Sequence, residues 1–236
     1  GGTIWNPGWQ PTKTELDSYS CRHGLGYTIL TGEKNGIRAQ QELFVPRGDA
    51  CEIDRLTLEN KTDAPRTLDV FSYVEFCLWD AMDDSSNFQR NFSTGEVEVV
   101  GSAIYHKTEY RERRDHYAVF WANTPVTSFD TSRDAFCGVY GGPAEPEAVK
   151  AGHCSNSVAH GWAPVGAHHF HLTLEAGEMK TILFGLGYIE NPVAEKFTAP
   201  GVINKARAEA MMARYATDAQ VDEARKALAA HWDDLL

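Results

Sequence analysis

A run of polar side chains that could bind a sugar follows an apolar stretch in the first half of the chain. Residues 74–79 are mostly apolar, and the connection after them carries carboxylate, amide and guanidinium groups at Asp80, Asp83, Asp84, Asn87, Gln89, Arg90 and Asn91. Such groups hydrogen-bond the hydroxyls of saccharides. Long ordered connections on a rigid scaffold are often functional. We therefore predict a saccharide-binding segment here, with a solvated acidic loop as the alternative.

Carboxylates of the same region could also act on a glycosidic bond. Glycosidases use two carboxylic acids, one as the general acid and the other as the base or nucleophile. Glu75 with Asp80 or Asp83 has the residue types for such a pair. Acidic clusters on loops are common, and the sequence gives no separation between these groups, so the pair is kept as an alternative.

Charges of opposite sign alternate between residues 106 and 116. The residues that would share one face of an extended strand are Lys107, Glu109, Arg111, Arg113 and Asp115. This alternation favours a cross-strand ion-pair ladder, an interface or a solvated charged face. A phosphate site on Arg111, Arg113 and Arg114 is a further alternative, because guanidinium groups suit phosphate oxygens. The interleaved acids weaken that hypothesis.

Three histidines lie close together near residue 170. In a strand, His168 falls on an apolar face with Phe170, whereas His169 and His171 fall on the opposite, polar face. A His-x-His pattern alone is a weak signal for metal ligands. We therefore predict no metal site and no bound cofactor.

Composition limits the partners and the cellular location. The 236 residues carry a formal net charge of −11, which repels nucleic-acid phosphates, so we expect no nucleic-acid partner. No run of about twenty apolar residues is present, so we expect no membrane span. The five cysteines are widely spaced without a C-x-x-C motif. Free thiols in a reducing cytoplasm explain them most simply, with a metal site or a cysteine nucleophile as alternatives.

The elements that must position these groups are mainly strands. Asn35-Gly36 between two apolar stretches predicts a tight hairpin. Residues 51–60 predict a further strand. Residues 67–79 are apolar on both alternating faces, so we expect this strand to be central and covered on both sides.

A second hairpin is predicted near the end of the β region, where residues 167–174 and 179–188 flank a short polar turn. Strands at this spacing, with Gly, Pro and Asn between them, favour a large antiparallel sandwich. We assign it to residues 1–192.

Helix-forming residues take over in residues 193–236, which we assign to a helical linker. Thr217 and Gln220 have the spacing of a capping box. Residues that then fall near one helical face are Val221, Ala224, Leu228 and Trp232. In isolation this apolar stripe would be exposed, so we expect a further domain beyond Leu236. Both ends of the chain look cut.

Five segments together resemble the cellobiose phosphorylases of glycoside hydrolase family 94. They are residues 5–17, 22–28, 74–80, 87–99 and 105–118, and include R-H-G-L-G-Y-T, V-E-F-C-L-W-D and N-F-Q-R-N-F-S-T-G-E-V-E-V. The resemblance covers nearly the whole chain. It implies a large antiparallel super-sandwich of the galactose-mutarotase type, lacking its first strands, then a short helical linker and an (α/α)₆ catalytic barrel that this chain lacks.

The resemblance also implies an activity. Such enzymes are homodimers that cleave cellobiose with inorganic phosphate, giving α-glucose 1-phosphate and glucose with inversion. Phosphate is the nucleophile and a co-substrate, and one carboxylic acid protonates the glycosidic oxygen. That acid lies in the barrel, so this chain would hold no catalytic residue. The sandwich of one subunit reaches the partner's active site, and Asn87 and Arg90 match the positions that contact the acceptor glucose.

Two other functions stay open. The chain could be a stand-alone carbohydrate-binding or dimerisation module, against which the unpartnered helical stripe argues. It could also be a self-sufficient glycosidase or sugar epimerase, which turnover by the isolated chain would support.

Overall fold

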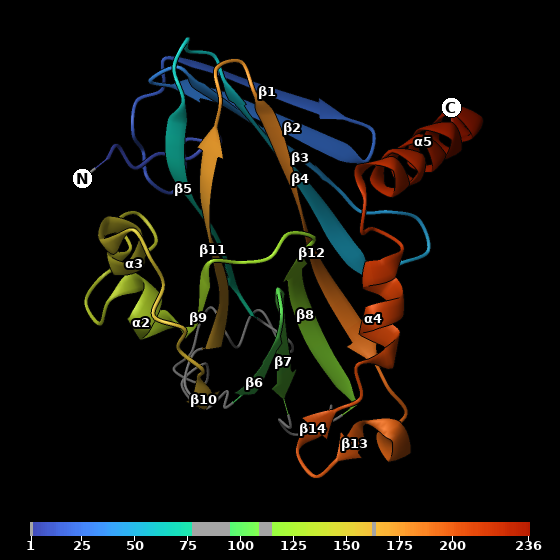
Figure 1. The fold of residues 1–236 in the computed structure, drawn as a ribbon. Helices are drawn as coiled ribbons and strands as arrows, with labels where there is room; N and C mark the ends of the chain where they lie inside the picture. Colours follow the sequence, from blue (N-terminus) through green and yellow to red (C-terminus); the bar gives the residue numbers. More distant parts are fainter. Residues whose placement is uncertain (1, 77–94, 109–114, 162–163) are drawn as a thin grey trace.

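The computed structural model describes residues 2–76, 95–108, 115–161 and 164–236 (Figure 1). Within these ranges the chain is mainly β and forms a nine-stranded, a three-stranded and a two-stranded sheet, all with antiparallel neighbours. The two larger sheets face each other as a sandwich, and the last helices lie on the far side of the large sheet (Figure 1). The predicted fold class, a large antiparallel sandwich followed by helices, is confirmed.

The large sheet combines strands from both halves of the chain. Its order is β1 (Ser18–Gly24), β2 (Tyr27–Lys34), β3 (Ile37–Phe44), β4 (Cys51–Asn60), β12 (Met179–Glu190), β8 (His116–Ala122), β7 (Ala103–Thr108), β6 (Gly95–Val100) and β10 (His160–Gly161). Pairing of β4 with β12 therefore joins the amino-terminal strands to the rest of the sheet.

The small sheet is built from three strands and two short helices cover its outer face. The strands are β5 (Arg66–Glu75), β11 (Pro164–Leu174) and β9 (Ser128–Ser132), and the helices are α2 (Arg133–Cys137) and α3 (Glu147–Ala151). Toward the large sheet, Val70 and Val74 pack on Phe120 and Phe184. On the outer face the ring of Tyr73 stacks on a helix residue, Phe136, at 4.9 Å.

The end of the chain covers the other face of the large sheet. It consists of η2 (Val193–Glu195), β13 (Phe197–Ala199), β14 (Val202–Ile203), α4 (Ala206–Ala213) and α5 (Asp218–Leu235). One core joins these elements to the sheet, and its buried members include Phe44, Ile53, Tyr117, Trp121, Met211, Val221 and Leu228. The large sheet is thus buried on both faces over much of its area. No helix of the described ranges is both long enough and apolar enough to cross a bilayer.

Local turn chemistry places the first hairpin as predicted. β2 and β3 pair from Tyr27–Phe44 to Lys34–Ile37. The turn residues Asn35 and Gly36 have φ values of 52° and 77°, the left-handed region that an Asn-Gly turn supplies. The predicted strand at residues 51–60 matches β4.

The second predicted hairpin is wrong, because β11 and β12 lie in different sheets. β11 pairs with β5 and β9, whereas β12 pairs with β4 and β8. The side-chain amide of buried Asn60 donates to the carbonyls of Leu174 and Glu175 at 3.1 and 3.0 Å. These bonds fix the end of β11 to the end of β4, so the turn becomes a corner between the sheets.

The strand predicted at residues 67–79 is described over Arg66–Glu75, and the prediction that both its faces are covered is confirmed. Its predicted central position is wrong within the described residues, because β5 stands at the edge of the small sheet. Apolar residues on both faces indicate that a strand is covered by layers above and below it. They do not indicate how many strands pair with it.

The helical stripe finds its partner within this chain. Thr217 caps α5 in a capping box with Gln220, as predicted. Val221 and Leu228 are buried against the large sheet, so the expectation that this stripe is exposed in the isolated chain is wrong, and the further domain beyond Leu236 stays a prediction. The helical period showed that a covered face exists, but it contained no information on what covers it.

Charged side chains anchor α5 to the same sheet. Arg55 of β4 lies 2.5 Å from Glu42 of β3 and 2.5 Å from Asp222 of α5. Arg225 reaches Glu42 at 3.3 Å and its guanidinium lies 3.7 Å from the centre of the Tyr27 ring. The helix therefore meets the sheet through both an apolar stripe and an ion network.

Candidate functional site

The predicted sugar-contact residues, Asn87 and Arg90, lie outside the described residues, so their role stays a prediction. The structure does place the strands on either side of them. β5 ends at Glu75, opposite Val165 of the small sheet, and β6 begins at Gly95, opposite Gly161 of the large sheet. The strand ends that bracket the candidate segment therefore belong to the two facing layers of the sandwich, at one end of the molecule (Figure 1).

His106 of β7 contacts the chain on both sides of this segment. The Phe76 ring stacks on the His106 imidazole at 4.8 Å with an interplanar angle of 3°. A Cβ at position 95 would lie 2.1 Å from His106 Nε2, so only glycine fits there. Burial lowers the pKa of His106 to about 4, and the ring stays neutral near pH 7. His106 is thus a positioning residue for the two ends of the segment.

Sequence reasoning missed this role of His106. Its partners are separated from it by thirty and by eleven positions, and the stacking depends on which strands pair. The glycine at position 95, which follows the polar segment directly, was the available signal that a close approach occurs there.

Glu75 takes part in local contacts at the same end of the sandwich. The Tyr73 hydroxyl donates to Glu75 at 2.6 Å, and Arg133 of α2 lies 3.4 Å from the same oxygen. Burial, together with the hydrogen bond to Glu75, raises the pKa of Tyr73. The other members of the hypothetical glycosidase pair, Asp80 and Asp83, lie outside the described residues, and that alternative stays a prediction.

One rung of the predicted ion-pair ladder is confirmed. Lys107 of β7 stands directly opposite Glu96 of β6, and the Lys107 ammonium lies 2.6 Å from the Glu96 carboxylate. Lys107 is buried, and it also donates to the carbonyl of Gly201. Asp115 is described, and its carboxylate lies 3.7 Å from its neighbour His116. The other members of the ladder and of the phosphate hypothesis, Glu109, Arg111, Arg113 and Arg114, lie outside the described residues.

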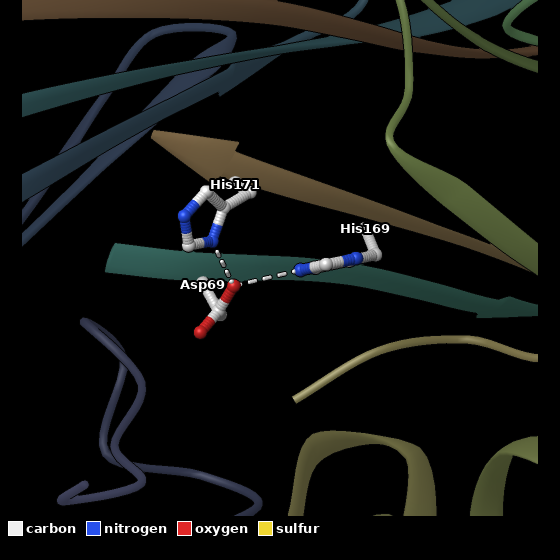
Figure 2. A group of neighbouring side chains, drawn as sticks. All are labelled: Asp69, His169 and His171. Carbon is white, nitrogen blue, oxygen red and sulfur yellow. Dashed lines mark hydrogen bonds and ion pairs between the residues drawn. The ribbon is translucent and has the colours of Figure 1, made fainter. Parts of the chain in front are cut away.

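The three histidines distribute over the two faces of β11 as predicted. His168 lies inside the sandwich, where its ring stacks on Phe120 at 4.7 Å and burial lowers its pKa to about 3. His169 and His171 project from the outer face of the small sheet toward the carboxylate of Asp69 on β5 (Figure 2). One oxygen, Asp69 Oδ1, accepts from His169 Nε2 at 2.9 Å and from His171 Nδ1 at 2.8 Å.

Asp69 was missed because it becomes a neighbour only through strand pairing. His171 stands opposite Asp69 in the register, and His169 stands two residues away, opposite Phe71. Although burial would raise the pKa of Asp69, hydrogen bonds from His171 and His169 outweigh it, and the net pKa is lowered. A sequence shows two histidines on one face of a strand, but not which residue of a distant strand faces them.

The cysteines of the described ranges have the character of free thiols. Cys21 is exposed, while Cys51, Cys137 and Cys154 are buried. Burial raises the pKa of Cys51 to about 12 and also raises those of Cys137 and Cys154. A buried thiol that stays protonated is a poor nucleophile.

Comparison with known proteins identifies the family. The model of the family described as "Glycosyl hydrolase 94, supersandwich domain" matches residues 1–218. An N,N'-diacetylchitobiose phosphorylase from Vibrio furnissii is 32% identical over 238 residues, which cover 99% of this chain and 28% of the relative. A solabiose phosphorylase from Paenibacillus borealis is 36% identical over 182 residues, covering 76% of this chain and 23% of the relative.

A solved structure shows the same fold. It comes from the human microbiome and carries the description kojibiose phosphorylase; it superposes with a TM-score of 0.58 at 14% identity, over 92% of this chain and 25% of that one. The chain thus spans about a quarter of the length of the relatives that it matches. Because the family model matches residues 1–218, the chain belongs to the glycosyl hydrolase 94 supersandwich-domain family.

Proposed function

We propose that this chain is the super-sandwich portion of an inverting disaccharide phosphorylase that converts cellobiose and phosphate to α-glucose 1-phosphate and glucose. The family match over residues 1–218 is the observation that carries the proposal. Support also comes from curated relatives whose names describe disaccharide phosphorylases and which align along 99% and 76% of this chain. The general acid belongs to a barrel outside this chain, so the chain alone is expected to be inactive.

Within this proposal the chain binds the acceptor sugar and takes part in assembly. Asn87 and Arg90 donate hydrogen bonds to the acceptor glucose at the active site of the partner subunit in a homodimer. Support comes from Phe76 and Gly95, on either side of the segment, which both pack on the buried ring of His106. These contacts fix the points at which the chain leaves the small sheet and enters the large one.

Cellobiose is the proposed substrate, with glucose as acceptor in the synthetic direction. The relatives are named for different disaccharides, among them N,N'-diacetylchitobiose, solabiose and 3-O-beta-D-glucopyranosyl-beta-D-glucuronide. Relatives of this domain are therefore found in enzymes named for different disaccharides. A panel of acceptors that includes glucose, N-acetylglucosamine and glucuronic acid separates the cellobiose proposal from these alternatives.

The test uses the full-length protein that contains this chain, as wild type and as Arg90→Ala and Asn87→Ala. Phosphate release from α-glucose 1-phosphate is measured with glucose as acceptor. Loss of a charge-assisted hydrogen bond costs about 1.5–3 kcal/mol, so Arg90→Ala should raise the KM for glucose by roughly 10- to 150-fold. The KM for α-glucose 1-phosphate should stay nearly unchanged.

Arg38→Ala provides the matched control. Arg38 is paired with Glu59 on β3 and β4, at 3.4 Å, far along the sheet from the candidate segment, and its loss should leave both constants unchanged. Equal constants for wild type and Arg90→Ala would show that Arg90 does not bind the acceptor. Absence of disaccharide synthesis by the wild type with every acceptor would overturn the phosphorylase proposal itself.

One observation favours a second candidate, a stand-alone carbohydrate-binding or dimerisation module. Val221 and Leu228 of α5 are buried on the chain's own sheet, so the helix does not require a further domain as partner. Calorimetric titration of the 236-residue chain with cellobiose, combined with its mass in solution, tests this candidate. Turnover by the isolated chain would instead support a self-sufficient glycosidase or epimerase.

A further inference from the structure

We propose that Asp69, His169 and His171 form a binding site for one divalent transition-metal ion of the zinc type, on the outer face of the small sheet. The candidate ligand atoms, one from each residue, lie within 4.8 Å of one another. They come from two directly paired strands, β5 and β11. The site is separate from the proposed acceptor-sugar segment, and its existence does not depend on the proposed phosphorylase activity.

The three donors converge because of the strand geometry. Residues two apart on a strand point to the same face, and the residue opposite one of them lies about 5 Å away. His169 and His171 satisfy the first condition, and Asp69 is the register partner of His171. Figure 2 shows both rings directed at the same carboxylate oxygen. The arrangement needs no rearrangement of the backbone to bring two nitrogens and one oxygen together.

Outer contacts hold His169 in the orientation that a ligand requires. Its Nε2 points to Asp69, while its Nδ1 lies 2.9 Å from the hydroxyl oxygen of Ser128. The backbone N–H of Cys154 donates to that same oxygen at 3.0 Å. With a metal ion in place of the Nε2 proton, the imidazole would carry its N–H at Nδ1, and the second lone pair of the serine could accept it. A metal-bound histidine commonly donates its other ring N–H to such a partner.

Packing adds rigidity on one side and leaves access on the other. The His169 ring is buried and stacks on Phe71 at 4.6 Å. By contrast, the side chains of Asp69 and His171 are 39% and 56% exposed. An ion could therefore enter from solvent, and water could complete a tetrahedral shell around the three protein ligands.

The donor types select the class of ion. Two imidazole nitrogens and one carboxylate oxygen suit zinc and its transition-metal neighbours. Calcium and magnesium prefer oxygen ligands only. Ligand atoms of a tetrahedral zinc ion stand about 3.3 Å apart for metal–ligand bonds of about 2.0 Å. The two nitrogen–oxygen separations are 2.8 and 2.9 Å and would open slightly. The two histidine nitrogens lie within 4.8 Å of each other and would move together, which the exposed His171 side chain allows.

The test is titration of the purified protein with zinc chloride by calorimetry, supported by the visible absorption of the cobalt(II)-loaded protein. The wild type should bind one zinc ion per chain, and the cobalt form should show the intense bands of a tetrahedral site. His171→Ala and Asp69→Asn remove exposed ligands and should weaken binding by at least about 100-fold, the upper end of what loss of an outer partner costs.

His231→Ala is the matched control, because His231 lies on α5, on the other side of the large sheet from this cluster (Figure 1). It should bind zinc as the wild type does. The proposal fails if the wild type binds no zinc, or if His171→Ala and Asp69→Asn retain wild-type affinity. Either result would leave the cluster as a carboxylate shared by two hydrogen-bonded imidazoles.

Discussion

Single buried residues with displaced pKa values make the stability of this protein depend on pH. His106 and His168 have pKa values lowered by burial to about 4 and about 3, well below the usual value of about 6.5. The unfolded chain therefore binds protons that the folded chain does not as the pH falls below about 6.5. The two histidines therefore leave the free energy of unfolding unaffected above about pH 6.5 and lower it progressively as the pH falls below that value.

His168→Phe should make the acid limb of the stability curve shallower. The phenyl ring keeps the stacking on Phe120 but cannot titrate, so the slope should fall by up to about 1.4 kcal/mol per pH unit between about pH 6.5 and pH 4. Urea unfolding at several pH values measures the slope. The exposed His153→Gln serves as control, and an unchanged slope in His168→Phe would contradict the assignment.

Asp54 produces the opposite dependence. Burial raises its pKa to about 7, although Gln41 donates to its carboxylate at 2.6 Å. Between about pH 4 and pH 7 the folded state holds a proton that the unfolded state has lost, so stability falls as the pH rises. The free energy of unfolding should decrease by at most about 4 kcal/mol over this range for this reason. Asp54→Asn should remove that decrease. The same urea series should show no such change for Glu15→Gln, a substitution at an exposed carboxylate; an equal slope in both variants would exclude Asp54 as the source.

At the scale of elements, α5 combines a polar cap, an apolar stripe and a set of ion pairs. The Thr217 side chain accepts a hydrogen bond from a backbone N–H of the first turn, and Arg55 joins Asp222 to the sheet. The buried stripe should contribute most. The Arg55–Asp222 pair is half exposed on the helix side and contributes little, and the desolvation of the more buried Arg225–Glu42 pair offsets much of its attraction.

Leu228→Ala should destabilise the protein by about 2–4 kcal/mol, since it removes a buried side chain from the interface between α5 and the sheet. Lys226→Ala lies on the exposed side of the same helix, where its partner Glu223 is three residues away, and should change stability by less than about 0.5 kcal/mol. Chemical denaturation of both variants makes the comparison. Equal effects would mean that α5 is not held by its apolar stripe.

Elements specified by neighbouring residues were predictable, and those specified by distant partners were not. The Asn35-Gly36 turn and the Thr217 cap depend on a few consecutive residues, and both match the structure. The false hairpin between β11 and β12 had suitable local chemistry, but Asn60 directs the two strands into different sheets. Strand β1 was missed because all its residues are exposed, so it shows no apolar alternation.

The candidate sites divide in the same way. His169 and His171 were assigned to one face of a strand from periodicity alone, whereas Asp69 and the anchoring role of His106 required the strand register. The roles of Asn87 and Arg90 rest on the resemblance and stay predictions. Local pattern therefore identifies residue types on a face, and tertiary pairing decides which of them meet.

At the scale of the whole molecule, the cores are joined through one sheet. Trp121 of β8 belongs to the core under α4 and α5, whereas its neighbour Phe120 belongs to the core between the two sheets. The two cores therefore share the strands of the large sheet.

The 236-residue chain alone should consequently unfold in one cooperative step. Tryptophan fluorescence and far-ultraviolet circular dichroism, recorded against denaturant, should give coincident transitions. Two separated transitions would show that the helical end or the small sheet melts independently. An unfolded chain at the outset would show that the sandwich needs further segments to fold.

The pairing of β4 with β12 has a consequence for synthesis on the ribosome. β4 is complete once residue 60 has emerged, but its second neighbour in the sheet starts only at Met179. For more than a hundred residues of elongation, the outer edge of β4 has no native strand to pair with, and such edges template aggregation. Closure of so long a loop also slows folding. Nascent chains should therefore depend on chaperones until β12 emerges, and the amino-terminal strands should complete their sheet only after that point.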